Sequence, residues 1–181
     1  MKHLKLIILP IVIFAVAFIS CERDDICPES TPTTPSLIID LYDFTNQENR
    51  KNVFNLVVVG VDNDTILPGY EFVTADDFIL PLKTDANSTQ YRLIKDATVN
   101  NNGTPDDSED DFIEGNIDII TINYTTEEVY VSRACGYKTI FNNVEVVITD
   151  DADNWLLGNP INLTNNQPVE NENATHFNLF H

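Results

Sequence analysis

Short runs of branched and aromatic residues, separated by polar turns, recur along the chain from position 37 onward. Each run is six to nine residues long, and most are bounded by Asn, Asp, Gly or Pro. Strands joined by turns have this composition. The pattern therefore predicts strands over residues 37–44, 53–61, 78–83, 89–95, 116–124, 127–134, 143–150 and 174–180.

Alternation between apolar and polar residues is clearest in the stretch NVEVVIT. Successive side chains of a strand point to opposite faces of the sheet. Val144, Val146 and Ile148 are therefore predicted to face a core, while Glu145 and Thr149 face water.

The run 53–61 is apolar at both odd and even positions, which predicts a central strand covered on both faces. The stretch NYTTEEVY joins the runs 116–124 and 127–134. It predicts a tight hairpin with Thr125 and Thr126 near its turn.

No window of the sequence shows a convincing helical stripe, and residues 153–158 are predicted to form at most one short helical turn, capped by Asp153 or Asn154. About eight short strands in a chain of this size favour a single antiparallel β-sandwich, immunoglobulin-like or jelly-roll-like, over a closed barrel. A true immunoglobulin domain is disfavoured because Trp155 follows Cys135 instead of lying between two cysteines.

The start of the chain has the features of a secretory signal. Two lysines precede residues 6–19, which are apolar except for a proline and are too short to span a bilayer. Ser20 and Cys21 resemble the lipobox of bacterial lipoproteins, which implies cleavage after residues 1–20 and lipidation of the Cys21 sulfur. Several acyl chains would give stable membrane anchoring. The alternative is an ordinary secreted protein in which Cys21 is free or bridged.

An acidic cluster, Glu22–Asp25 with one arginine, follows the lipidation site. It resembles the surface-export signal of Bacteroidetes-type lipoproteins; the alternative is a solvated tether. Residues 21–36 are polar and rich in proline, so we expect a tether there and a β-sandwich domain over 37–181. The expected location is the cell envelope, as an outer-membrane lipoprotein that is exposed at the surface.

The chain is strongly acidic, with a formal net charge of −19 over 181 residues. Phosphate backbones repel such a chain, so we expect no nucleic-acid partner. The hydrophobic fraction of 43% argues against wholesale disorder.

Once Cys21 is lipidated, two cysteines remain, Cys27 and Cys135. In an oxidising envelope such a pair indicates one disulfide, and two free thiols are the alternative. Zinc is not expected, because these cysteines and the mature histidines His176 and His181 have no recognisable ligand spacing.

The acidic, asparagine-rich stretch 96–111 is the strongest candidate for a metal site. Aligned to the calcium loop of EF-hands, it places Gly103 at the turn and oxygen-bearing residues at alternate positions. A threonine stands at the first position, where aspartate is usual, and a solvated acidic loop is the alternative. The candidate calcium ligands are Asn100, Asn102, Thr104 through its carbonyl, Asp106 and Glu109.

Enzyme signatures are missing from the sequence. There is no Gly-x-Ser-x-Gly elbow and no phosphate-binding glycine loop. His176 is expected to face solvent on an edge strand, so no catalytic residue is predicted. Thr65 in the triplet DTI matches the short acceptor of Bacteroidetes O-glycosylation and is a candidate glycosylation site.

Several stretches together resemble a family of uncharacterised flavobacterial lipoproteins. They are CERDDIC, TPTTPSLIIDLYD, ILPLK, VSRACGY and THFNLF, and the resemblance covers essentially the whole chain. It implies a single β-rich lipoprotein domain of unknown function, with Cys27 and Cys135 as its cysteine pair. It implies no catalytic residues.

These observations favour a non-catalytic, lipid-anchored envelope protein that acts as an accessory factor and binds another protein, such as an outer-membrane barrel protein. The alternative is a surface module that binds a glycan or calcium. An exposed apolar patch would favour the first hypothesis. A concave aromatic cleft would favour the second.

Overall fold

The structure is a computed structural model that describes residues 26–31 and 33–181. It is all-β, and no helix occurs among the described residues. The described residues form ten strands: β1 (Leu37–Tyr42), β2 (Val53–Gly60), β3 (Thr65–Ile66), β4 (Val73–Ala75), β5 (Asp77–Leu80), β6 (Ser88–Asn100), β7 (Phe112–Ser132), β8 (Gly136–Ile148), β9 (Leu157–Asn162) and β10 (Phe177–Phe180).

The chain divides into two compact units. The larger unit comprises Pro32–Val129 and Lys138–His181. The described part of the smaller unit comprises residues 26–31 and Tyr130–Tyr137, the tip where β7 turns into β8. No helix in the described part of the chain is long and apolar enough to cross a membrane.

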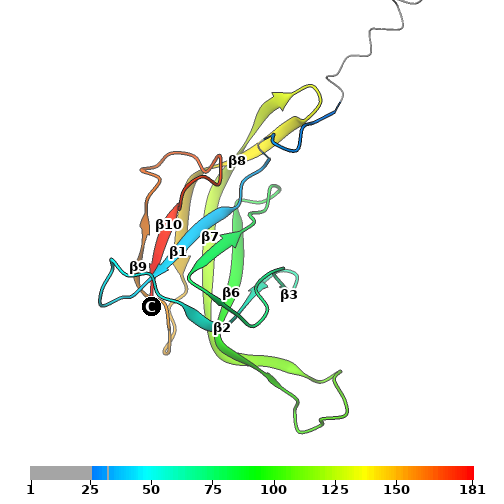
Figure 1. Ribbon diagram of the computed structural model, residues 1–181, viewed down its shortest axis with the longest axis vertical. Coiled ribbons are helices and arrows are strands. Elements are labelled where there is room, and N and C mark those ends of the chain that lie inside the picture. Colours follow the sequence, from blue (N-terminus) through cyan, green and yellow to red (C-terminus); the bar gives the residue numbers. More distant parts are fainter. Residues whose placement is uncertain (1–25, 32) are drawn as a thin grey trace, which may run out of the picture. The chain divides into compact units, whose positions relative to one another are not determined.

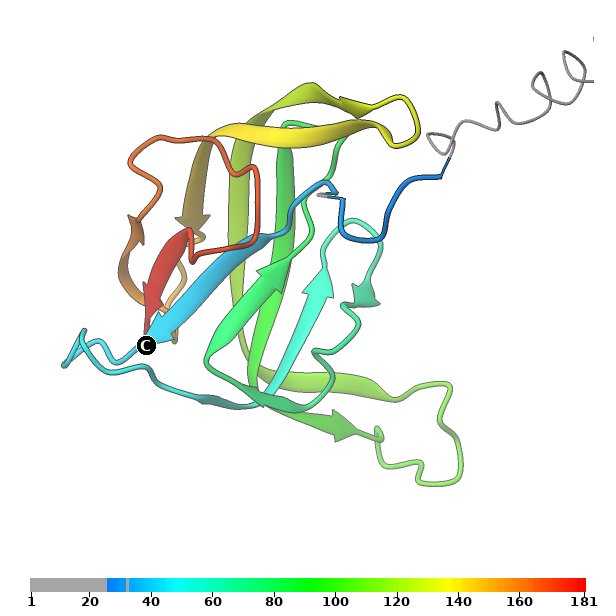
Figure 2. The ribbon, with the colours of Figure 1, turned by 45° about the horizontal axis from the view of Figure 1, so that its top comes forward.

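The strands form two sheets packed as a sandwich, which confirms the predicted fold class (Figures 1 and 2). One sheet has the order β5-β1-β10-β9, and the other has the order β3-β2-β6-β7-β8, with β4 pairing beside β2. The fold departs from a wholly antiparallel sandwich in one pairing, because β1 and β10 run parallel. A parallel pair requires a long crossover, and most of the domain lies between these two strands.

The main core lies between the two sheets. Alternate residues of β1 point inward, so Leu37, Ile39 and Leu41 are fully buried. They pack with Phe78 of β5 and with inward residues of the opposite sheet such as Ile120 of β7.

A second, smaller core lies on the outer face of β2 and β6. It is expected because β2 is apolar at both odd and even positions. It contains Val57 and Val59 of β2 with Ile94 of β6, and Ile66 and Phe72 pack against it. The prediction that β2 is covered on both faces is therefore confirmed.

The predicted alternation along β8 is also confirmed. Val144 and Val146 are buried and Ile148 is half-buried, whereas Glu145 and Thr149 are exposed. Asn143, the first residue of this stretch, has a φ of 53°.

The predicted hairpin at Thr125 and Thr126 is wrong. β7 continues through both threonines to Ser132, and the chain turns only before Gly136, whose φ is 71°. Threonine is β-branched and favours an extended strand, whereas glycine adopts a left-handed conformation without a Cβ penalty.

The predicted helical turn at 153–158 is also wrong. Residues 153–156 form irregular turns, and β9 begins at Leu157. The backbone N–H groups of Trp155 and Leu156 donate to the carboxylate of Asp118, at 3.2 and 2.7 Å, instead of to a helical ladder. The two N–H groups therefore bond to a side chain distant in sequence, and not to the carbonyl groups of a helical turn.

His176 does not face solvent, as the sequence had suggested, but is buried. Its Nδ1 accepts a hydrogen bond from the Ile38 backbone N–H at 2.9 Å, and its Nε2 lies 3.1 Å from the Asn171 carbonyl oxygen. The Ile38 bond requires an unprotonated Nδ1, so Nε2 carries the proton and donates to Asn171. β10 lies between β1 and β9, which explains why the ring is covered.

Burial lowers the pKa of both His176 and His181 below the ordinary value of 6.5. Between the lowered pKa and 6.5 the unfolded chain binds more protons than the folded chain, so stability decreases as the pH falls through this window. Each histidine contributes a slope of at most about 1.4 kcal/mol per pH unit. We expect His176→Gln to lose less unfolding free energy than the unmodified chain on acidification from about pH 7.5 to about pH 5.5, measured by urea denaturation. Equal losses in the two chains would contradict this assignment.

Candidate functional site

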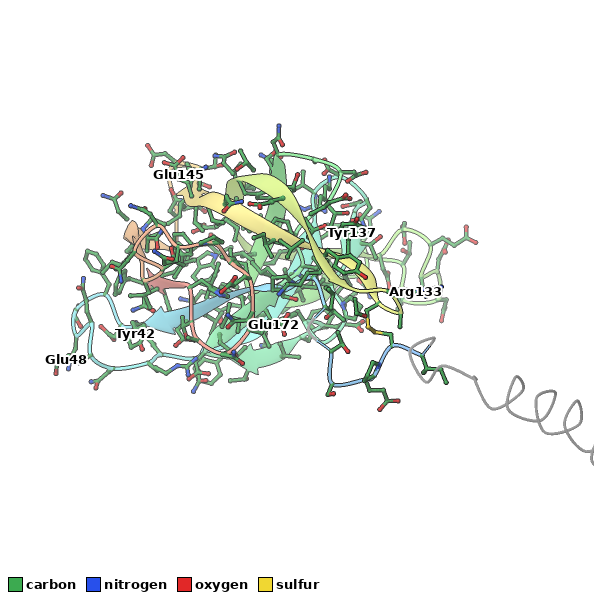
Figure 3. All side chains as sticks on the ribbon, turned by 90° about the horizontal axis from the view of Figure 1, so that it is seen from above. Tyr42, Glu48, Arg133, Tyr137, Glu145 and Glu172 are labelled. Carbon is green, nitrogen blue, oxygen red and sulfur yellow. A yellow bond between two sulfur atoms is a disulfide. The ribbon has the colours of Figure 1, made fainter. Side chains whose placement is uncertain are left out.

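A groove of about 1060 Å³ runs along β8 and β9 in the larger unit. The two strands belong to different sheets, and each is the last strand of its sheet. The turn at residues 150–156 links them in sequence and lines one part of the groove. Glu145, labelled in Figure 3, projects from β8 in this region.

The groove has an apolar floor and polar walls. Val144, Val146, Leu156 and Phe177 line it and are themselves buried members of the main core. The floor therefore belongs to the rigid part of the sandwich, which gives the groove a preformed shape.

The walls of the groove are acidic. Three carboxylates line it, those of Glu145, Asp150 and Asp151, and no Lys, Arg or His is among its lining residues. The remaining polar side chains are mostly amides, from Asn143, Asn154, Asn159, Asn162 and Asn166. Carboxylates that line one cleft raise the local concentration of cationic ligands.

The backbone of β8 offers hydrogen-bonding groups to this groove. The Asn162 amide donates to the Val144 carbonyl oxygen at 3.4 Å, so the peptide groups of Val144 point toward β9. The backbone N–H and C=O groups of successive residues in a strand point to opposite sides. Those of Val146 and Ile148 therefore point toward β9, as those of Val144 do. Thr149, an odd-numbered residue, points to the other side: its backbone N–H donates to the Ile119 carbonyl oxygen of β7 at 2.8 Å, in agreement with this assignment.

The edge of β8 is covered over its first half and lines the groove over its second half. The Thr139 N–H donates to the Thr34 hydroxyl at 3.0 Å, and the Phe141 backbone pairs with Val169 at 3.1 and 2.8 Å, whereas Val144–Ile148 line the groove. The N–H of Ile79 on edge strand β5 donates to the Tyr70 hydroxyl at 2.7 Å. The edge strand β3 has only two residues, whereas five residues of β8, Val144–Ile148, border the groove. Short or covered edges are how sheets avoid unwanted pairing, and a long edge strand is a template for another strand.

Asp118 holds the turn that carries part of the groove wall, and sequence reasoning missed it. It lies on β7 with no exposed surface, and its two carboxylate oxygens accept from the N–H groups of Trp155 and Leu156. Burial raises the pKa of Asp118, and the two backbone hydrogen bonds oppose that shift. Asp118 lies two and four positions before the buried Ile120 and Ile122, so the alternation of side chains along β7 places it on the core face.

Amide side chains fix the rest of the turn. Asn154 accepts from the Asp151 N–H at 2.8 Å and donates to the Thr149 carbonyl at 3.0 Å. Asn116 of β7 donates to the Asp153 carbonyl at 2.9 Å. The acidic side chains at 150 and 151 are therefore carried by a hydrogen-bonded turn.

The candidate calcium residues lie in the exposed loop between β6 and β7. Asn102 and Thr104 come together around Asp110, which was not among the predicted ligands: its carboxylate accepts from the Thr104 hydroxyl at 2.8 and 2.9 Å and from the Asn102 amide at 3.1 Å. These bonds lower the pKa of Asp110. The Asn100 side chain donates to Glu114 at 2.8 Å and accepts from the Asn102 backbone N–H at 2.9 Å.

The Glu109 N–H donates to Asp107 at 3.0 Å, which was not a predicted ligand. No group of three or more His, Cys, Asp or Glu side chains in the described residues is placed to hold a metal ion. Calcium binding by this loop stays a prediction.

Three other candidate residues lie outside the groove. Thr65 is exposed on β3, with its hydroxyl donating to the Asn63 carbonyl at 3.0 Å, and its glycosylation stays a prediction. Cys21 lies outside the described residues, and so does the lipobox. Cys27 and Cys135 form a disulfide, as the cysteine count suggested.

A family model matches residues 55–181 and is described as a family of unknown function (DUF6452). No curated protein and no solved structure matches the chain. The matched region covers the groove and all strands from β3 to β10, together with most of β2.

Proposed function

The chain belongs to this family of unknown function, and we propose that it is a non-catalytic, lipid-anchored accessory protein of the cell envelope that binds another protein in the groove between β8 and β9. The observation that carries this proposal is the acidic groove beside the Val144–Ile148 edge of β8. The bound element is an extended segment of the partner, which adds a strand to β8.

The proposed location follows from the start of the chain. A short apolar run ending in Ser20-Cys21 supports lipidation of Cys21, and the acidic residues after it support export to the outer surface of the outer membrane. A partner in the same membrane, such as an outer-membrane barrel protein, would then be within reach of the domain.

Strand addition is supported by the direction of the β8 backbone. Val146 and Ile148 present backbone groups toward the groove, and an extended peptide there would form main-chain hydrogen bonds with them. The apolar floor offers Val144 and Val146 to alternate side chains of the bound segment.

The charge of the groove selects among extended segments. Glu145, Asp150 and Asp151 lie in the same groove without a lining cation, so a segment that alternates basic and apolar residues fits it best. The partner's apolar side chains would face the floor and its basic side chains the walls.

Glycan binding, the alternative from the sequence, has less support in this groove. Sugars are commonly bound on exposed aromatic faces, but Phe177 is the sole aromatic residue among those lining the groove and is only 2% exposed. Calcium binding would concern the separate loop between β6 and β7.

Charge reversal in the groove provides the test. We expect Glu145→Lys with Asp150→Lys to weaken binding of a synthetic peptide of alternating lysine and valine by about tenfold or more, because two attractive charges become repulsive. The matched control is Glu48→Lys with Glu128→Lys, which makes the same change in net charge at exposed positions outside the groove. Calorimetric titration of the full-length protein measures both.

A pull-down of the tagged full-length variants from native outer membrane in mild detergent, read by mass spectrometry, extends the test to the natural partner. The proposal predicts a stoichiometric protein retained by the control pair and lost by the groove pair. A solitary bait, equal retention by the two variants, or equal affinity for the peptide would overturn the groove as the binding site.

A further inference from the structure

The smaller unit exposes a pair of tyrosines at the tip between β7 and β8. Tyr130 and Tyr137 are 58% and 66% exposed, and their rings pack edge to face with centroids 5.4 Å apart. In the same unit Ile26 is 80% exposed, next to the disulfide between Cys27 and Cys135 (Figure 3). Paired exposed aromatics on an ordered turn differ from the single apolar residues common on protein surfaces.

The disulfide places this tip close to the proposed lipid. Cys27 lies six positions after Cys21, and an extended chain spans at most about 3.6 Å per residue, so Cys27 stays within about 22 Å of Cys21. Because Cys27 is bonded to Cys135, the tip is held within the same reach. Without the bond, the first fixed point after Cys21 would be the start of β1 at Leu37, at more than twice that distance in sequence.

The chemistry of the tip matches a membrane interface. The segment 130–137, YVSRACGY, contains no carboxylate in a chain with 29 acidic residues. Tyrosine has an apolar ring and a polar hydroxyl, and it is enriched where lipid headgroups meet the acyl chains. The Cys135 N–H donates to the Ser132 hydroxyl at 3.0 Å, so the turn is already ordered before it meets a surface.

We propose that the β7–β8 tip docks on the phospholipid bilayer that holds Cys21, with Tyr130, Tyr137 and Ile26 in the headgroup region and the Cys27–Cys135 disulfide as the staple that keeps them there. This inference rests on the lipidation in the proposed function. Tyr130, Tyr137 and Ile26 are uncharged, so their insertion persists at high salt and does not need anionic lipid; Arg133 is the one charged residue of the segment 130–137.

The test uses the full-length protein, purified from membranes and reconstituted in vesicles of phosphatidylcholine with brominated acyl chains, which quench nearby tryptophan. The chain's single tryptophan, Trp155, is buried, so a second tryptophan introduced at the surface dominates the quenching. We expect strong quenching in Tyr137→Trp, unchanged by high salt. Little quenching is expected in Phe54→Trp, whose exposed ring lies on β2 in the larger unit.

Cys27→Ser with Cys135→Ser, added to Tyr137→Trp, should reduce the quenching because the tip is released. Absent quenching of Tyr137→Trp, or equal quenching of Phe54→Trp, would overturn the docking. Mass spectrometry of the N-terminal peptide separates the two proposals. A lipidated Cys21 without quenching refutes the docking alone, whereas an unmodified Cys21 refutes the anchor and the docking with it.

Discussion

Asp118→Ala is expected to destabilise the fold strongly. Its carboxylate is the acceptor for the N–H groups of Trp155 and Leu156, and all three residues are buried. Each buried donor left without an acceptor costs about 1–3 kcal/mol, so the loss of unfolding free energy should reach about 2–6 kcal/mol. Burying the carboxylate is itself unfavourable, and the alanine variant avoids that cost, so the loss of unfolding free energy should lie toward the lower end of this range. The buried Trp155 provides a fluorescence signal for urea unfolding.

Asp85→Ala is the matched control for this substitution. Asp85 is exposed, so removing its carboxylate should change stability by no more than about 0.5 kcal/mol. Asp118→Asn should fall between the two variants, because one amide oxygen still accepts while the amide N–H₂ faces a donor. Equal midpoints for Asp118→Ala and Asp85→Ala would show that the carboxylate does not hold the turn.

Removing the disulfide is expected to have an effect of similar size. Cys27 and Cys135 are 108 residues apart in sequence, and closing a loop of that length removes unfolded-state entropy worth about 4–5 kcal/mol. The double variant Cys27→Ser with Cys135→Ser should therefore unfold at a clearly lower urea concentration. This value is an upper bound, because residues 26–31 gain freedom in the folded variant as well.

The reduced form of the unmodified chain is the control for the serine pair. Both lack the bond, so their unfolding midpoints should agree, while the oxidised chain should be more stable. Identical midpoints for the oxidised and reduced chains would mean that the unfolded state gains no conformational entropy when the disulfide is absent.

Most strands could be predicted from the sequence because a two-residue period survives even where the strand is half-buried. β9, Leu157–Asn162, was not predicted, because Gly158 and Pro160 interrupt its pattern. Proline is tolerated on an edge strand, where its missing N–H needs no ladder partner. The pairing of β9 with β10 is tertiary information that no local pattern carries.

The candidate groove was only partly within reach of sequence reasoning. The exposure of Glu145 followed from alternation along β8. The burial of Asp118 was not predicted, although its position in the same alternation as Ile120 carried the signal. The meeting of β8 with β9 could not be predicted, because it depends on which strand ends each sheet. The sandwich order is set by long-range pairing, including the parallel contact of β1 with β10.

Site-specific photo-crosslinking from Val147 tests the central claim most directly. Val147 lies on β8, lines the groove and is 41% exposed. Ile79, 45% exposed on the covered edge strand β5, is the matched control. With a photoreactive residue at either position of the full-length protein in its native membrane, the account predicts a discrete crosslink from position 147 alone, to a basic, extended segment of one partner. No crosslink from position 147, or the same products from both positions, would contradict it.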